Sequence, residues 1–148
     1  MKSYFVGALA LVSTWAMPAA AQQALKGYSA NCQACHGPTG AGTAAFPKLA
    51  GRLDAAARTP AGRVWMISTV LFGQFGRILV DGRPMNGLMP PLARLTDADV
   101  AQALSFLVQG RSPAFTAAEV ATVRKGPRKS AAQVVQERAK VAADGLIN

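Results

Sequence analysis

The segment Cys32-Gln33-Ala34-Cys35-His36 constrains this chain most, because it contains both cysteines and the only histidine among 148 residues. C-x-x-C-H is the pattern at which a c-type haem is attached, each cysteine sulfur forming a thioether with a vinyl group of the porphyrin. The adjacent histidine can then bind the iron as its proximal ligand. The sequence therefore predicts one covalent haem c, attached to Cys32 and Cys35 and ligated by His36.

Three other uses of these residues agree less well with the sequence. A structural zinc site usually needs four cysteine or histidine ligands, and the chain has three. A thioredoxin-like redox pair requires alternating strands and helices, which the sequence does not show. A simple disulfide would leave His36 without a role.

The N-terminus has the pattern of a cleaved Sec-type signal peptide, residues 1–21. Lys2 precedes the apolar run 5–12, and the alanines 19–21 match a small-x-small cleavage site. A retained membrane anchor is the alternative, but an apolar stretch that ends at Pro18 is short for a bilayer span. Because c-type haem is attached outside the bacterial cytoplasmic membrane, we expect a periplasmic protein without a transmembrane anchor after cleavage.

The chain is basic, with a formal net charge of +9, of which cleavage would remove only Lys2. A surface of this kind favours acidic partners or membrane surfaces. The basic residues are scattered rather than arranged along one helix, which disfavours nucleic acid as a partner.

The pattern of apolar residues and breakers predicts helices joined by Gly- and Pro-rich loops, an all-α fold. Thr59, Thr96, Thr116 and Ser130 resemble helix N-caps. The predicted helices cover residues 23–33, 60–72, 97–109 and 117–126, with a last one after Ser130. Residues 78–80 read as a short extended segment, followed by a tight turn at Asp81-Gly82.

Because His36 is the only histidine, the sixth iron position must hold a methionine, another weak donor, water or nothing. Two of the five methionines fall in the predicted signal peptide, and Met66 lies in a helical pattern typical of core packing. Met85 and Met89 remain. Met89 is flanked by Gly87 and Pro90-Pro91, which predict a loop that is rigid on one side and permissive on the other. Met89 is therefore the expected ligand and Met85 the runner-up.

Over residues 24–110 the chain resembles class I cytochromes c, in which the haem motif lies near the mature N-terminus and the axial methionine precedes the last core helix. The resemblance implies a class I cytochrome c fold around one haem. It also implies that the carbonyl of Pro47, in the segment 46–51, accepts the Nδ1 hydrogen of His36. Leu49 would pack on the haem in the same pocket.

Residues 82–90, which read G-R-P-M-N-G-L-M-P, are similar to a loop in cytochrome domains and subunits of bacterial periplasmic dehydrogenases, including the quinoprotein type. The usual pattern there is G-x-x-[YF]-N-G-x-M-P. Met85 occupies the aromatic position, which makes Met85 a packing residue. This narrower resemblance implies a periplasmic dehydrogenase as electron donor.

From these features we expect a cytochrome c domain over residues 22–112 and a C-terminal helical extension over 113–148. We expect an electron carrier of a respiratory chain, not an enzyme, that accepts single electrons from a dehydrogenase and passes them to a downstream cytochrome or terminal oxidase. Two alternatives remain open. One is a cytochrome subunit permanently bound to a dehydrogenase, and the other is a haem sensor or catalyst with an open sixth iron position.

Basic side chains near the predicted haem segments are expected to steer acidic partners to the haem edge: Lys26, Lys48, Arg52 and Arg94. Beyond Gly126 an apolar stripe at 134, 135, 141 and 142 alternates with basic residues, which suggests a partner-docking helix rather than part of the haem pocket. A solvated or frayed terminal helix is the alternative reading.

Overall fold

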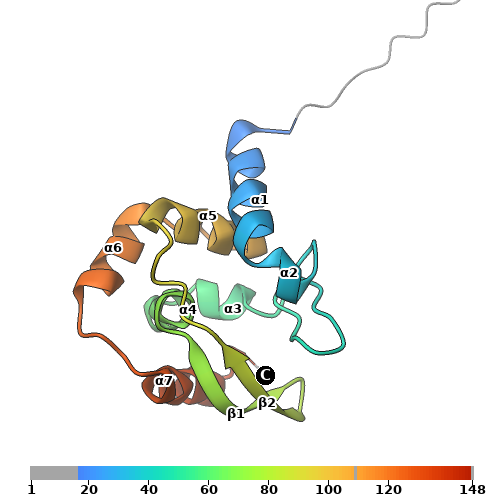
Figure 1. The fold of residues 1–148 in the computed structure, drawn as a ribbon, viewed down its shortest axis with the longest axis vertical. Helices are drawn as coiled ribbons and strands as arrows, with labels where there is room; N and C mark the ends of the chain where they lie inside the picture. Colours follow the sequence, from blue (N-terminus) through green and yellow to red (C-terminus); the bar gives the residue numbers. More distant parts are fainter. Residues whose placement is uncertain (1–16, 109, 148) are drawn as a thin grey trace, which may run out of the picture.

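The computed structural model describes residues 17–108 and 110–147, which form helices and one β-hairpin (Figure 1). This mostly helical architecture agrees with the expected all-α fold, with a small sheet added to it. The elements are α1 (Ala19–Asn31), α2 (Gln33–His36), α3 (Asp54–Ala57), α4 (Pro60–Phe72), β1 (Gln74–Val80), β2 (Arg83–Met89), α5 (Asp97–Val108), α6 (Ala117–Lys125) and α7 (Ala131–Ala143).

The predicted signal peptide lies mostly outside the described residues, which begin at Met17. Helix α1 starts at Ala19, four residues before the predicted start, and so runs across the expected cleavage point after Ala21. Cleavage there would leave most of the helix in the mature chain. Between residues 17 and 147, Gln109 excepted, no helix combines the length and apolar character that a membrane span requires.

Helices α1 and α5 cross in close contact and form one side of the core. The ring of Tyr28 is fully buried and stacks on Phe106, with ring centroids 4.4 Å apart. At the crossing, a Cβ added to Gly27 would lie 2.8 Å from the Cβ of Gln102. Contacts that short do not occur between real Cβ atoms, so glycine is what lets the two helices approach.

The start of α4 agrees with the sequence prediction. Thr59 caps the helix by accepting a hydrogen bond from the backbone N–H of Gly62, and Pro60 occupies the first turn, where its missing donor is not needed. Gly73, with a φ of 76°, ends the helix. The helix buries Trp65, Met66, Ile67, Val70 and Leu71, which places it at the centre of the core.

The sequence prediction was wrong about residues 83–89, which form a strand rather than a loop. The turn at Asp81-Gly82 joins β1 and β2 into an antiparallel hairpin, and both turn residues have positive φ, as a type I′ turn requires. The register pairs Ile78 with Met85 and Gln74 with Met89. Pro84 and Gly87 are usual loop signals, but a two-stranded hairpin tolerates them because each strand has a free edge.

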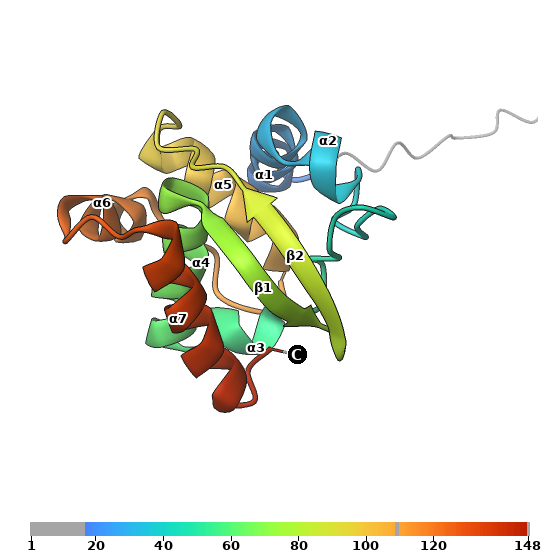
Figure 2. The ribbon, with the colours of Figure 1, turned by 60° about the horizontal axis from the view of Figure 1, so that its bottom comes forward.

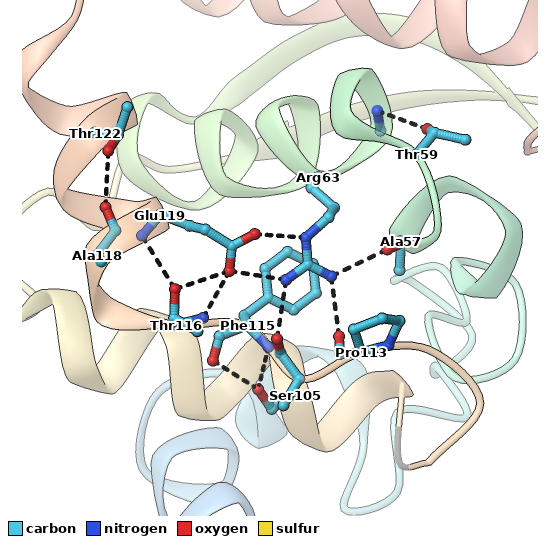
Figure 3. Close-up of polar contacts among 12 residues, drawn as sticks. Ala57, Thr59, Arg63, Ser105, Pro113, Phe115, Thr116, Ala118, Glu119 and Thr122 are labelled. Atoms are coloured by element: carbon cyan, nitrogen blue, oxygen red, sulfur yellow. Dashed lines mark hydrogen bonds and ion pairs between the residues drawn. The ribbon is translucent and has the colours of Figure 1, made fainter.

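Polar contacts of α6 fasten the C-terminal region to the core (Figure 3). Thr116 and Glu119 form the expected capping box at the start of α6. The guanidinium of Arg63 on α4 makes a two-point contact with Glu119, at 2.7 and 2.9 Å, and lies over the ring of Phe115. It also donates to three carbonyl oxygens, those of Ala57, Pro113 and Ala114.

Helix α7 packs along β1 and α4, on the side of β1 that faces away from β2 (Figure 2). Ser130 and Gln133 form the expected capping box at its start. Val134 and Val141 are almost completely buried. The prediction that this apolar stripe docks a partner was therefore wrong, and so was the alternative of a solvated, frayed helix, because Val134 and Val141 of the stripe are buried in the protein's own core and Val135 and Ala142 are half-buried.

Candidate functional site

His36 is held in one orientation by its own backbone and by the loop that follows. Gly37, with a φ of 77°, ends α2 directly after the histidine. The Nδ1 atom of His36 lies 3.0 Å from the carbonyl oxygen of Pro47. Because a carbonyl can only accept, Nδ1 carries the hydrogen, and Nε2 keeps a lone pair that can bind a metal. His36 as a whole is 8% exposed, so few other partners can reach its ring.

The loop after the motif folds back tightly to bring Pro47 to the histidine. The backbone N–H of Gly42 donates to the carbonyl of His36 at 2.9 Å. A Cβ at Gly42 would lie 2.6 Å from the backbone nitrogen of Lys48, and its φ is 81°. Glycine is therefore required there for the two arms of the loop to approach each other.

One cavity of about 430 Å³ collects the predicted site residues. Its wall is largely apolar and is built by α2, the loop after it, α4, the hairpin and α7. The sequence-predicted residues at the wall are Cys32, Cys35, His36, Pro47, Leu49, Met85 and Met89. Neither cysteine is in a disulfide, so both sulfurs are available for thioether bonds.

The two methionines reach the cavity from the same strand. Met85 and Met89 lie four residues apart on β2, an even spacing that places both side chains on one face of the hairpin, and both are half-buried. Met89 ends the strand and packs against the buried hydrophobic core of the protein, as Leu92 does. Gly73 allows this end of the strand to approach α4, because a Cβ there would lie 2.7 Å from the carbonyl oxygen of Met89.

Several buried polar atoms at the cavity wall have no hydrogen-bond partner within the described chain. They belong to Arg52 (Nε and Nη2), Trp65 (Nε1) and Gln74 (Oε1). Arg52 forms an ion pair with Asp81 at 3.4 Å, without the geometry of a hydrogen bond. Burying a polar group without a partner is costly, so these atoms indicate that the cavity is shaped for a ligand with polar ends.

Two guanidinium groups lie in this region. The Arg52 side chain is 7% exposed, and Arg138 on α7 is 6% exposed and donates to the carbonyl of Leu79. Burial lowers the pKa of both, and for Arg138 the nearby charge of Arg52 lowers the pKa further. Since arginine stays protonated in proteins, the site carries concentrated positive charge that one exposed carboxylate, Asp81, only partly balances.

Sequence reasoning assigned Arg52 to the surface and overlooked Arg138 as a site residue. Of the four basic side chains expected to steer partners, Lys26, Lys48 and Arg94 are exposed, but Arg52 is buried at the cavity. Arg138 stands between Val134 and Val141 at helical spacing, on the buried face of α7. A charged residue inside an apolar helical stripe is the signal that could have identified it.

These residues match haem c in chemistry. The porphyrin is flat and apolar, which suits the wall, and its two propionate carboxylates suit the unpaired donors of Arg52 and Trp65 and the nearby charge of Arg138. Two free thiols and a histidine with an available nitrogen stand at the same cavity. The described residues hold no cluster of three or more His, Cys, Asp or Glu side chains that could bind a separate metal ion.

Comparison with known proteins also indicates a protein that binds haem c. The family described as Cytochrome c matches residues 21–111. Cytochrome c-552 of Thermus thermophilus is 35% identical over 122 residues, which cover 76% of this chain and 92% of that protein. A second cytochrome c-552 from the same species shows the same identity, with 81% of that protein covered. The chain therefore belongs to the cytochrome c family, as a class I protein with one covalently bound haem c.

Proposed function

We propose that this protein carries single electrons in the periplasm between a dehydrogenase and a downstream cytochrome or terminal oxidase. An electron-carrier role follows from the family. The observation that most strongly supports transfer of single electrons, rather than chemistry on a substrate, is that His36 and Met89 line one cavity from two separate elements. With a protein ligand available for each axial position, the site has no place for a substrate at the metal and is suited to outer-sphere electron transfer.

In this proposal His36 is the proximal ligand and Met89 the distal ligand, with thioether bonds at Cys32 and Cys35. The hydrogen bond from His36 Nδ1 to Pro47 fixes the ring and strengthens Nε2 as a donor. A thioether is a weak, soft ligand that favours the ferrous state, so Met89 would raise the reduction potential. Haem c supplies the one-electron couple, and these residues hold it, tune it and exclude water from it.

Arg52, Arg138 and Trp65 hold the polar edge of the haem in this proposal. Their donors are buried and two of the three side chains have unpaired nitrogen atoms, which the propionate carboxylates would satisfy. Arg138 belongs to α7, so the C-terminal extension over residues 113–148 contributes to haem binding.

Export to the periplasm is supported by residues 1–21, which have the pattern of a cleaved signal peptide. The partners are inferred from the similarity of residues 82–90 to cytochromes that serve dehydrogenases. The net positive charge of +9 suits acidic redox partners.

Expression in a bacterium that attaches haem c tests this proposal. The protein should appear in the periplasmic fraction, begin at Gln22 and show a one-electron potentiometric titration. Haem should stay with the polypeptide in a denaturing gel, and replacing both Cys32 and Cys35 by alanine should abolish that signal. Haem that remains attached in the double variant, or a holoprotein confined to the cytoplasm, would contradict the proposal.

A further inference from the structure

The outer face of the hairpin carries an exposed apolar patch that lies mostly outside the proposed haem site. Side chains alternate across a strand, so Phe75, Arg77 and Leu79 of β1 share one face. Their partners across the hairpin are Leu88, Asn86 and Pro84. We call these six residues the hairpin outer face. The opposite face carries Ile78, Met85 and Met89, which line the cavity. Of the hairpin outer face, Asn86 and Leu88 also border the cavity, whereas Phe75, Arg77, Leu79 and Pro84 do not.

Exposed apolar side chains are more concentrated on this face than elsewhere on the described surface. Among the described residues seven large apolar side chains are exposed, and three of them lie here: Phe75 and Leu88 are 65% exposed and Leu79 is 54% exposed. Phe75 and Leu88 are direct cross-strand partners, so they form one continuous patch. Clusters of this kind mark interaction surfaces more often than isolated apolar residues do.

The charges around the patch identify the kind of partner. Arg77 lies within the hairpin outer face and Arg83 beside it, and both are exposed. Asp81, the acidic residue of the turn, is paired with Arg52. A second copy of this chain would place arginine against arginine, and two arginines are few for stable binding to an anionic membrane. An apolar patch edged by carboxylates on another protein would match both features.

The position of the face relates it to electron transfer. A partner docked there would be separated from the cavity by one layer, the hairpin itself, whose last residue is the proposed ligand Met89. Electron tunnelling weakens steeply with distance, so a single layer of protein is a suitable barrier. Small interfaces with a modest apolar centre are typical of transient redox complexes.

We propose that the hairpin outer face docks a redox protein partner through an apolar patch edged by carboxylates, and so forms an electron port on the methionine side of the haem. The inference rests on the proposed electron-carrier function. It adds a second port to the exposed haem edge near Cys35 that the sequence suggested.

Voltammetry at a gold electrode coated with mixed methyl- and carboxylate-terminated thiols tests this docking face, because that surface reproduces the partner's chemistry. The F75S/L79S double variant should lower the interfacial electron-transfer rate constant at least about fivefold, since both side chains are exposed and neither lines the cavity. Its spectrum, its potential and its rate with dissolved ferricyanide should match the wild type. Val64→Ser, which removes an exposed apolar side chain from α4, should leave the electrode rate unchanged.

An unchanged electrode rate in F75S/L79S, or an equal loss in Val64→Ser, would overturn the docking proposal. Two further results would overturn the proposal. One is binding of the wild type to anionic phospholipid vesicles, and the other is formation of a wild-type dimer, in each case if F75S/L79S alone abolished it. A membrane or a second copy would then occupy the face. A wild type that exchanges electrons with neither ferricyanide nor the electrode would instead contradict the electron-carrier function itself.

Discussion

At the scale of single residues, the choice between Met89 and Met85 decides how the site works. Both side chains line the cavity from the same face of β2. Met89 ends the strand at the point where Gly73 lets it approach α4, whereas Met85 lies inside the strand opposite Ile78. The fixed position of Met89 against the core suits a ligand that must stay in place through both oxidation states.

Met89→Ala should open the distal position, because Met66 at the same wall is held in the core of α4 and Met85 lies inside the strand. We expect the reduction potential to fall by on the order of 0.1 V or more, and the ferrous protein to bind carbon monoxide. Potentiometric and optical titrations measure both effects. Met85→Leu is the matched control and should change neither; the reverse pattern would transfer the ligand role to Met85.

Glu119 links residue chemistry to the stability of the fold. Its hydrogen bonds from Arg63 hold its pKa at about 2, below its ordinary value of 4.5, although burial acts in the opposite direction. A carboxyl group with a lowered folded-state pKa stabilises the fold above its unfolded pKa, and this contribution is lost as the pH falls through the folded-state value. The contribution of Glu119 should therefore be complete near neutral pH and disappear between about pH 4.5 and pH 2.

Glu119→Gln should therefore unfold at a lower denaturant concentration than the wild type at pH 7, with the difference shrinking below pH 4.5. Denaturant titrations of the holoprotein at about pH 7 and about pH 3, followed by circular dichroism, measure this difference. Asp144→Asn, which changes an exposed carboxylate at the end of α7, is the control variant. A Glu119→Gln difference that stays constant with pH would show that the Arg63 contact contributes nothing through charge.

At the scale of elements, α7 is the part of the molecule whose role differs most from the sequence prediction. It buries two valines and an arginine against β1 and α4. Lys129, just before the helix, donates to the buried hydroxyl of Ser68 on α4 and pairs with Glu137. The helix is thus part of the core and of the cavity wall.

A chain that ends at Gly126 should lose stability, because it lacks the buried Val134 and Val141. We expect the free energy of unfolding to fall by about 3 kcal/mol or more, as burial of two valines implies.

Arg138→Met, which keeps most of the packing, should lower the reduction potential, since a cation near the haem favours the ferrous form. Lys140→Met, at an exposed position of the same helix, is the control. A truncated chain with wild-type stability and potential would refute this role for α7.

The elements also show what the sequence could and could not predict. Helix starts at Thr59, Thr116 and Ser130 were predicted from their capping residues, because capping depends on a few neighbouring side chains. Strand β2 was missed because its stability comes from pairing with β1, and Pro84 and Gly87 locally favour a loop. The role of Arg138 depends on contacts with β1, 59 residues away in sequence, which no local pattern contains.

At the scale of the whole molecule, helices and hairpin together build the cavity that the predicted site residues line. Helix α1 packs on α5, α4 forms the centre, and the hairpin and α7 cover the far side of the core (Figures 1 and 2). The attachment motif was predictable because C-x-x-C-H requires only adjacent residues. The polar groups at the cavity wall were not predictable, because Arg52, Trp65 and Arg138 come from three separate segments.

The central claim is that the protein itself occupies both axial positions of its haem. Exposure of the reduced wild-type holoprotein to carbon monoxide at neutral pH, followed by optical spectroscopy, tests it most directly. We predict that the spectrum stays unchanged and that Met89→Ala binds carbon monoxide under the same conditions. Rapid, saturable binding by the wild type would contradict the account and would indicate a sensor or catalyst with an open sixth position.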